Sequence, residues 1–142
     1  MSDQKPILDQ LGRLLRQLTR LAGGADDDGP ALTASQRIAL VELGQDGPLR
    51  LNDLAHRMGV SAPTASRAVD ALEALGVAAR ATDAEDRRAL SIGLTPQGRA
   101  LFDERLARAA AAFRPATAAL TAAERRTLLE LLERMTAALR ES

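Results

Sequence analysis

The sequence predicts a mainly α-helical fold with one small β-structure. Leucine and alanine recur at three- and four-residue spacings along most of the chain, which is the period of a helix that buries one face. Two segments open with the spacing of a helix-capping box, and one region alternates apolar and small residues as a strand does. Aromatic residues make up only 1% of the 142 residues, so alanine and leucine must fill the core, which suits closely packed helices.

The composition limits the function classes. The hydrophobic content of 46% is enough for a compact core, but no run approaches the roughly 20 apolar residues of a membrane span. The N-terminal segment lacks a signal-peptide pattern, so we expect a cytoplasmic protein. Because there is no cysteine and His56 is the only histidine, we expect no metal site, no cofactor and no redox-active thiol. The formal net charge of zero gives no general attraction to a polyanionic partner.

The first predicted helix covers residues 1–22. Leucines at helical spacing form one apolar stripe, and arginines occupy the opposite face. The run GGADDDGP, from Gly23 to Pro30, then ends the helix as a loop. We expect Asp26–Asp28 to form a solvated linker rather than a cation site. The stripe comprises Leu8, Leu11, Leu15 and Leu18.

Two shorter helices follow. Thr33 and Gln36 have capping-box spacing, so a helix is predicted from there to Gly44. A third helix is predicted over roughly Asn52–Met58. Its inward face consists of Leu54, Ala55 and Met58.

The fourth predicted helix begins soon after the third. Gly59 can take the left-handed conformation that ends a helix, and Ser61 is placed to cap the next one. The run SAPTASRAVDALEALG then carries one apolar stripe and ends at Gly76. The residues predicted to be buried are Ala65, Ala68, Val69, Leu72 and Leu75.

Two short strands come next. The segments VAARAT and ALSIGLT flank the polar turn DAEDRR. In the second strand, Leu90, Ile92 and Leu94 are expected to share the one buried face.

Two helices are predicted after the strands. Thr95 can cap a helix whose first residue is Pro96, and a break is expected near Pro115. Thr121 and Glu124 form a second capping box at the start of the last helix. A lone helix cannot bury its own stripe, so this one must pack on another helix, and the leucine-rich first helix is the candidate. The stripe comprises Leu128, Leu132, Met135 and Leu139.

The central elements form a helix-turn-helix followed by a hairpin, which is the winged form of that motif. A helix can enter the major groove of DNA only if its exposed face has short side chains near its N-terminus, with polar groups that reach bases and phosphates. The start of the fourth helix meets this requirement with Ala62, Pro63, Thr64, Ser66 and Arg67. Arg67 could contact a guanine edge or a phosphate, and the sequence leaves both open.

The turn DAEDRR supplies two more arginines. A narrow minor groove concentrates negative potential, and Arg87 is the better candidate for insertion there. Asp86 is expected to orient a neighbouring guanidinium, from Arg80 or Arg88, through a charge-assisted hydrogen bond. An ordinary solvated hairpin tip is the alternative, and the position directly after a helix-turn-helix disfavours it.

Residues 32–104 resemble the MarR family of winged-helix transcriptional regulators. The most specific parts are the runs SAPTASRAVDALEALGV and DRRALSIGLTPQGR, which have the family's order and spacing. The resemblance implies a homodimer on a pseudo-palindromic double-stranded DNA operator, acting as a repressor that a small-molecule effector releases. It also implies a DNA-binding domain at residues 31–98 and dimerisation helices at residues 1–22 and 99–142.

The resemblance assigns residues to both interfaces. The two leucine stripes, one in each terminal segment, become the dimerisation residues. Arg50 stands where many relatives have a capping threonine or serine, so the third helix is expected to begin at Asn52. The DNA-binding residues are Ser61, Ala62, Pro63, Thr64, Ser66, Arg67, Arg80, Asp86, Arg87 and Arg88.

Other interpretations fit less well. A winged helix that binds proteins instead of DNA would favour an apolar exposed face, which Ser66, Arg67 and Asp70 do not provide. An enzyme is not expected, because the chain has no cysteine to pair with its one histidine and no glycine-rich phosphate loop. We expect His56 to be a surface or phosphate-contacting residue rather than a sensor. We expect Phe102 and Phe113 to pack in the core rather than to line a ligand pocket.

Residues 50–95 contain six arginines and six acidic residues. This segment is therefore formally neutral, and its non-specific affinity for DNA is expected to be modest.

Overall fold

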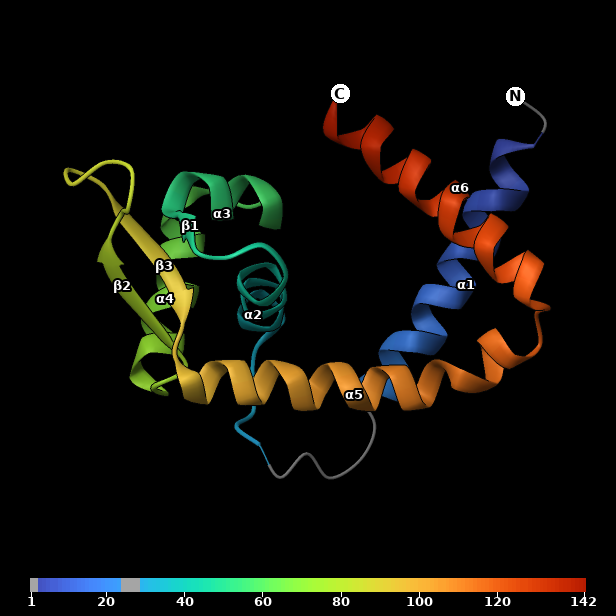
Figure 1. Ribbon diagram of the computed structural model, residues 1–142, viewed down its shortest axis with the longest axis horizontal. Helices are drawn as coiled ribbons and strands as arrows, with labels where there is room; N and C mark the ends of the chain where they lie inside the picture. The colour runs from blue at the N-terminus through green and yellow to red at the C-terminus, as the bar shows by residue number, and fades with distance from the viewer. Residues whose placement is uncertain (1–2, 24–28) are drawn as a thin grey trace. The chain divides into compact units, whose positions relative to one another are not determined.

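The computed structural model describes residues 3–23 and 29–142, and the predicted linker Asp26–Asp28 lies outside them. Within the described residues the chain forms six helices and a three-stranded antiparallel sheet (Figure 1), which confirms the predicted mainly α-helical class with a small β-structure. The elements are α1 (Gln4–Gly23), α2 (Ala34–Asp46), β1 (Leu49–Arg50), α3 (Leu51–Met58), α4 (Ala62–Ala74), β2 (Ala78–Thr82), β3 (Leu90–Leu94), α5 (Pro96–Ala118) and α6 (Ala122–Arg140).

The chain divides into two compact units. The winged unit covers Ala25–Leu106, and the terminal-helix unit consists of Met1–Gly24 together with Ala107–Ser142. The division falls inside α5, so this helix contributes to both units. The winged unit contains the predicted helix-turn-helix, α3 and α4, and the wing, which is the hairpin of β2 and β3 with its turn.

Helices α2, α3 and α4, the sheet and the first turns of α5 form the core of the winged unit. Helices α2, α3 and α4 pack on one another, and α2 also contacts β3. The inward faces predicted for α3 and α4 are buried, except at Leu75, which is 39% exposed. Leu75 is the C-cap of α4, where the chain already turns away toward β2. The most completely buried large side chains are Leu40, Leu43, Leu54, Val69, Leu72, Val77 and Ile92.

Local signals set most helix ends as predicted. Thr33 Oγ1 accepts a hydrogen bond from Gln36 N at 3.3 Å, and the Gln36 side chain accepts one from Thr33 N at 3.1 Å. Gly59 and Gly76 end α3 and α4 with φ of 70° and 77°, in the left-handed region where glycine is favoured. These predictions are confirmed. They could be made from the sequence because each cap depends only on residues a few positions away in the chain.

Two predicted helix ends were wrong. Helix α2 continues past Gly44 to Asp46, and Gly44 instead makes room for the ring of Phe102, which a β-carbon at this position would overlap. Phe102 is buried, which confirms its core role. Helix α5 runs through Pro115 to Ala118 without ending. The alanine-rich segment before the proline favours the helix strongly, and only about one turn remains beyond it.

The sheet contains a strand that the sequence did not reveal. Strand β1 has two residues, too few to show an alternating pattern, and β3 lies between β1 and β2. The predicted burial of Leu90 was wrong, since it is 56% exposed while Ser91 is buried. Leu90 pairs with Thr82 at the turn end of the wing, whereas Ser91 lies between Arg50 and Ala81 in the middle of the sheet.

The base of the wing is fixed by the start of α5. Thr95 Oγ1 accepts a hydrogen bond from Gly98 N at 3.0 Å, which confirms the predicted cap, and donates one to the Gly76 carbonyl at 2.6 Å. Gly98 is buried against the Val77 backbone so closely that a β-carbon would overlap the Val77 carbonyl oxygen. This contact joins the first turn of α5 to the segment that leads into β2.

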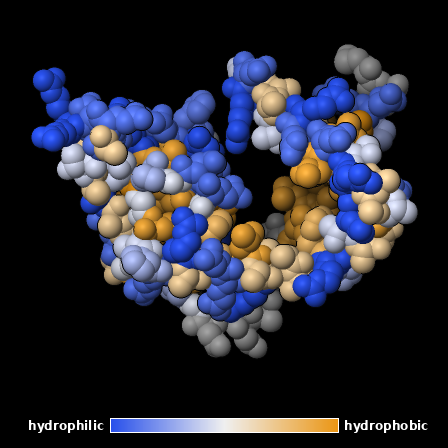
Figure 2. Space-filling view, viewed as in Figure 1, coloured by the Kyte–Doolittle hydropathy of each residue, from blue (hydrophilic) through white to orange (hydrophobic). Residues whose placement is uncertain are grey.

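The terminal-helix unit exposes its apolar residues. The predicted capping box of Thr121 and Glu124 is present, but no residue of α6 is buried. Leu15 of α1 and Leu139 of α6 are 65% and 77% exposed. Figure 2 shows apolar side chains gathered over these helices. The expectation that α1 covers the α6 stripe is therefore not met within a single chain. Among the described residues, no helix is both long and apolar enough to cross a membrane.

Candidate nucleic-acid interface

The first turn of α4 is held by its cap. Ser61 Oγ accepts a hydrogen bond from Thr64 N at 3.3 Å and lies 2.9 Å from Thr64 Oγ1, so both hydroxyl groups are fixed at the start of the helix. Ala65 faces the core, which leaves Pro63 and Arg67 exposed on the other side. The face that was predicted to enter the major groove is thus accessible and carries short side chains in its first turn.

Arg67 extends from this face. Its Nη2 donates a hydrogen bond to Thr64 Oγ1 at 3.4 Å. In the part of the chain that the structure describes, Arg67 forms no ion pair with an acidic side chain. Its charge is therefore available to a phosphate or a base edge.

Arg80 of β2 is engaged by α4. Its guanidinium forms ion pairs with Glu73 and, at 3.1 Å, with Asp70, and it donates a hydrogen bond to Ser66 Oγ at 3.4 Å. These contacts neutralise two carboxylates on the helix that carries Arg67. Arg80 also orients Ser66, one of the predicted recognition residues.

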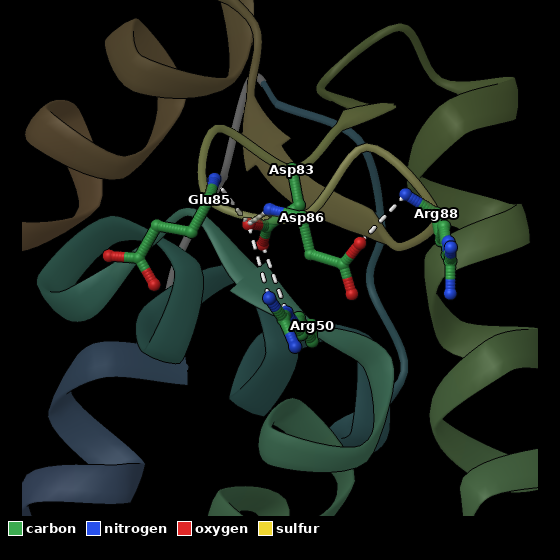
Figure 3. Close-up of polar contacts among 5 residues, drawn as sticks. All are labelled: Arg50, Asp83, Glu85, Asp86 and Arg88. Atoms are coloured by element: carbon green, nitrogen blue, oxygen red, sulfur yellow. Dashed lines mark hydrogen bonds and ion pairs between the residues drawn. The ribbon is translucent and has the colours of Figure 1, made fainter.

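The turn of the wing is organised by aspartates (Figure 3). Asp83 Oδ1 accepts hydrogen bonds from Glu85 N at 2.8 Å and Asp86 N at 3.1 Å. Asp86 Oδ1 accepts one from Arg88 N at 2.9 Å. The expectation that Asp86 holds the guanidinium of Arg80 or Arg88 was wrong, because its partner is a backbone amide. Arg87 and Arg88 are exposed at this turn.

The pairing of Asp83 with Arg50 was not predicted from the sequence. Arg50 Nε donates to Asp83 Oδ2 at 3.0 Å and Nη2 donates to Oδ1 at 3.3 Å. Together with the Glu85 amide, the Arg50 guanidinium lowers the pKa of Asp83 from 3.8 to about 2. Arg50 makes no side-chain capping bond, and α3 still begins at Leu51, one residue before the predicted start. The only hint in the sequence was an arginine at a capping position.

The structure sorts the six arginines of residues 50–95 into two groups. Arg50, Arg57 and Arg80 are paired with carboxylates, Arg57 with Asp46 at 2.8 Å. Within residues 3–23 and 29–142, the remaining three form no ion pair: Arg67 on α4, and Arg87 and Arg88 in the wing. The formal charge of residues 50–95 is zero, but the unpaired arginines are not spread evenly. All three lie at positions that were predicted to contact DNA.

Two other residues were assigned roles from the sequence. His56 is exposed on α3. Phe113 is only half-buried on α5 and is not among the buried core residues, so the expectation that it packs in the core as Phe102 does was wrong. Among the described residues, no three side chains of the types that bind metals come together as a site.

A capped helix that follows a short turn, and a cationic hairpin beside it, define a winged helix-turn-helix protein. Residues 32–89 match the profile of the MarR family. Over 76 residues the chain is 33% identical to the HTH-type transcriptional repressor MdtR of Bacillus subtilis (strain 168). The matched segment covers 54% of this chain and 49% of MdtR. The match thus spans about half the length of that curated relative.

Solved structures agree over nearly the whole chain. A probable transcriptional regulator from Pseudomonas aeruginosa is 38% identical, with 91% of this chain and 98% of the other covered and a TM-score of 0.58. A MarR family regulator from Silicibacter pomeroyi is 28% identical, with coverage of 95% and 89% and a TM-score of 0.69. BpsR of Bordetella bronchiseptica is also 28% identical, with coverage of 90% and 91% and a TM-score of 0.66.

Residues 32–89 are thus a MarR family domain, and the chain as a whole is similar to solved transcriptional regulators of this family. Proteins of this family regulate transcription and are not enzymes, in agreement with the expectation from the sequence.

Proposed function

We propose that this protein is a homodimeric repressor that binds a pseudo-palindromic operator in double-stranded DNA, in the cytoplasm, and leaves it when a small molecule binds. The observation that carries the proposal is the placement of the arginines without an acidic partner. Arg67 lies on the exposed face of α4, and Arg87 and Arg88 lie at the tip of the wing. A helix in the major groove and a hairpin at the adjacent minor groove need cations at these two places.

The remaining predicted residues take supporting roles in this proposal. Ser61, Ala62, Pro63 and Thr64 form the short-chained first turn of α4 that approaches the bases. Arg80 acts through α4, because it neutralises Asp70 and Glu73 and orients Ser66. Without this neutralisation, two carboxylates on α4 would repel the phosphates of the duplex.

Dimer formation is supported by the exposed stripes of the terminal-helix unit. Stable soluble proteins rarely leave large apolar patches in contact with water. A second copy of the chain would cover them, and a two-fold dimer would carry two α4 helices, one for each half-site of a pseudo-palindromic operator. The stripe residues are Leu8, Leu11, Leu15 and Leu18 in α1, and Leu128, Leu132, Met135 and Leu139 in α6, and all except the half-buried Leu18 are exposed.

Effector control is supported by a relative. The DNA binding of BpsR is regulated by 6-hydroxynicotinic acid. For this chain we propose a small-molecule effector without assigning its chemistry.

Selection of bound duplexes from a random library tests the proposal. The purified protein is incubated with the library at low salt, and bound fragments are sequenced. We expect a pseudo-palindromic consensus whose half-sites are about 10 base pairs apart. Sedimentation analysis of the free protein is expected to show a dimer. A stable monomer, or a protein that binds no duplex at low salt, would refute the proposed function.

A further inference from the structure

One carboxylate at the base of the wing turn has an unusually complete set of donors. Asp83 accepts two hydrogen bonds from the Arg50 guanidinium and two from the backbone amides of Glu85 and Asp86. Figure 3 shows Arg50 on one side of the carboxylate and the turn backbone on the other. Asp83 therefore connects the turn of the wing to a residue that lies 33 positions earlier in the chain.

The same turn holds the backbone on both sides of Arg87. Asp83 N donates to the Ala89 carbonyl at 3.0 Å, and Ala89 N donates to the Asp86 carbonyl at 3.0 Å. Asp86 Oδ1 accepts from Arg88 N at 2.9 Å. The Arg87 side chain itself makes no hydrogen bond or ion pair within the described residues. Its backbone position is therefore fixed while its guanidinium stays available.

Arg50 is anchored at the other end of this connection. It belongs to β1, where it pairs with Ser91 of the central strand, and it is also the N-cap residue of α3. Its guanidinium does not cap α3 and is directed to Asp83 instead. The link thus runs from the start of the helix-turn-helix to the turn that carries Arg87.

We infer that Arg50 and Asp83 are positioning residues, which hold the wing turn against the helix-turn-helix so that Arg87 meets the duplex in a single orientation. This inference rests on the proposed function. Without the link, the turn samples more conformations, and binding must then supply the cost of ordering it. The neighbouring arginine Arg57 does not share this role, because its partners Asp46 and Glu42 lie on α2.

The first experiment measures the wing without DNA. Amide hydrogen exchange is compared in the wild-type protein, in Arg50→Ala and in the matched control Arg57→Ala, which also removes a paired arginine from the winged unit. We expect faster exchange at Glu85 and Asp86 in Arg50→Ala only. Core amides of α2 and α4 should exchange as in the wild type, which shows that the unit remains folded. Unchanged exchange at the wing would overturn the inference.

The second experiment is a double-mutant cycle on DNA affinity. Binding to a selected operator is measured for Arg50→Ala, for Arg87→Ala and for both together. If Arg50 acts through Arg87, Arg50→Ala weakens binding in the wild-type background and has almost no effect once Arg87 is alanine. If Arg50 contacts a phosphate itself, the two losses add, and the inference fails.

Conservative variants separate the effect of charge from the effect of hydrogen-bond geometry. Arg50→Lys keeps the charge but not the two-donor geometry, so its affinity should lie between those of the wild type and Arg50→Ala. Asp83→Asn keeps an oxygen that accepts hydrogen bonds from the turn amides. It should therefore lose only the part of the DNA affinity that depends on the ion pair with Arg50. If Arg50→Lys equals Arg50→Ala while Asp83→Asn equals the wild type, the pairing of these two residues does not matter. A wild-type protein that binds no duplex would refute the proposed function, and the exchange data would still decide whether Arg50 holds the wing.

Discussion

The uneven distribution of paired arginines predicts how DNA binding depends on salt. On duplex DNA, each phosphate that the protein neutralises contributes about −0.9 to the slope of log affinity against log salt. Arg67, Arg87 and Arg88 of two protomers give six cations, and hence a slope of about −5.4, or about −3.6 if Arg67 contacts a base instead. If all six arginines of residues 50–95 were to bind phosphates, the slope would be about −11.

These values are far enough apart to measure. Fluorescence anisotropy of a labelled operator, at salt concentrations from about 50 to about 200 mM, should show a loss of affinity on the order of 10³-fold for a slope near −5.4. Arg87→Ala removes one cation from each protomer and should make the slope shallower by about 2. Each lost contact is worth about 1–3 kcal/mol, and the dimer loses two, so the affinity should fall by about 30-fold or more.

Arg80→Ala is the matched control in the same hairpin. Arg80 is paired with Asp70 and Glu73, so its removal should weaken binding through the exposed carboxylates without changing the number of phosphates neutralised. The slope should therefore stay near the wild-type value. A wild-type slope near −11, or an equal change of slope for Arg80→Ala and Arg87→Ala, would show that the ion pairs open on DNA. Either result would refute the assignment of contacts from the pairing in the free protein.

Three further predictions concern the fold, the wing and the dimer. Gly98→Ala should destabilise the winged unit by about 2–3 kcal/mol in urea unfolding, because its β-carbon would overlap the Val77 carbonyl; Gly12→Ala, where the nearest atom lies at 3.5 Å, should cause no such loss. NMR titration should give a pKa of about 2 for Asp83 and a value nearer 3.8 in Arg50→Ala. Because the folded-state pKa is lowered, this stabilisation is complete above about pH 4 and is lost as the pH falls toward 2; an equal pKa in both proteins would contradict the pairing of Arg50 with Asp83. Leu132→Glu should raise the dimer dissociation constant by about 100-fold or more, since a charge replaces an apolar contact in each protomer. Sedimentation would detect this change, with Ala123→Glu of the same helix as control, and an intact dimer would place the interface elsewhere.

Sequence reasoning succeeded where the cause of a structure is local. Thr33, Ser61 and Thr121 cap their helices because each hydroxyl meets an amide three residues ahead. Gly44 was misjudged because its reason is distant, namely the Phe102 ring on another helix. Strand β1 was missed because two residues are too few to show alternation, and only pairing with β3 defines them.

For the candidate interface, too, the local features could be predicted from the sequence and the long-range contacts could not. The residue types on α4 and in the wing follow from composition and spacing, so Arg67 and Arg87 could be predicted as DNA contacts from the sequence, and they remain predictions. Which arginines are already paired does not follow, because Arg50 and Asp83 meet only after β1, β2 and β3 assemble. The sequence contains six arginines and six acidic residues in residues 50–95. These equal counts do not show whether every arginine is paired or whether some unpaired arginines gather in one place.

This distribution affects selectivity as well as affinity. A chain without net charge gains little long-range attraction to any duplex, so its binding depends on the few cations that remain unpaired. Those cations contribute fully only where α4 and the wing fit the grooves together. Arg50, at the N-cap of α3, makes no side-chain capping bond, but its pairing with Asp83 connects the wing turn to the start of the helix-turn-helix. Loosening this link should therefore reduce affinity for the operator more than affinity for unrelated DNA, where the wing does not need a single orientation.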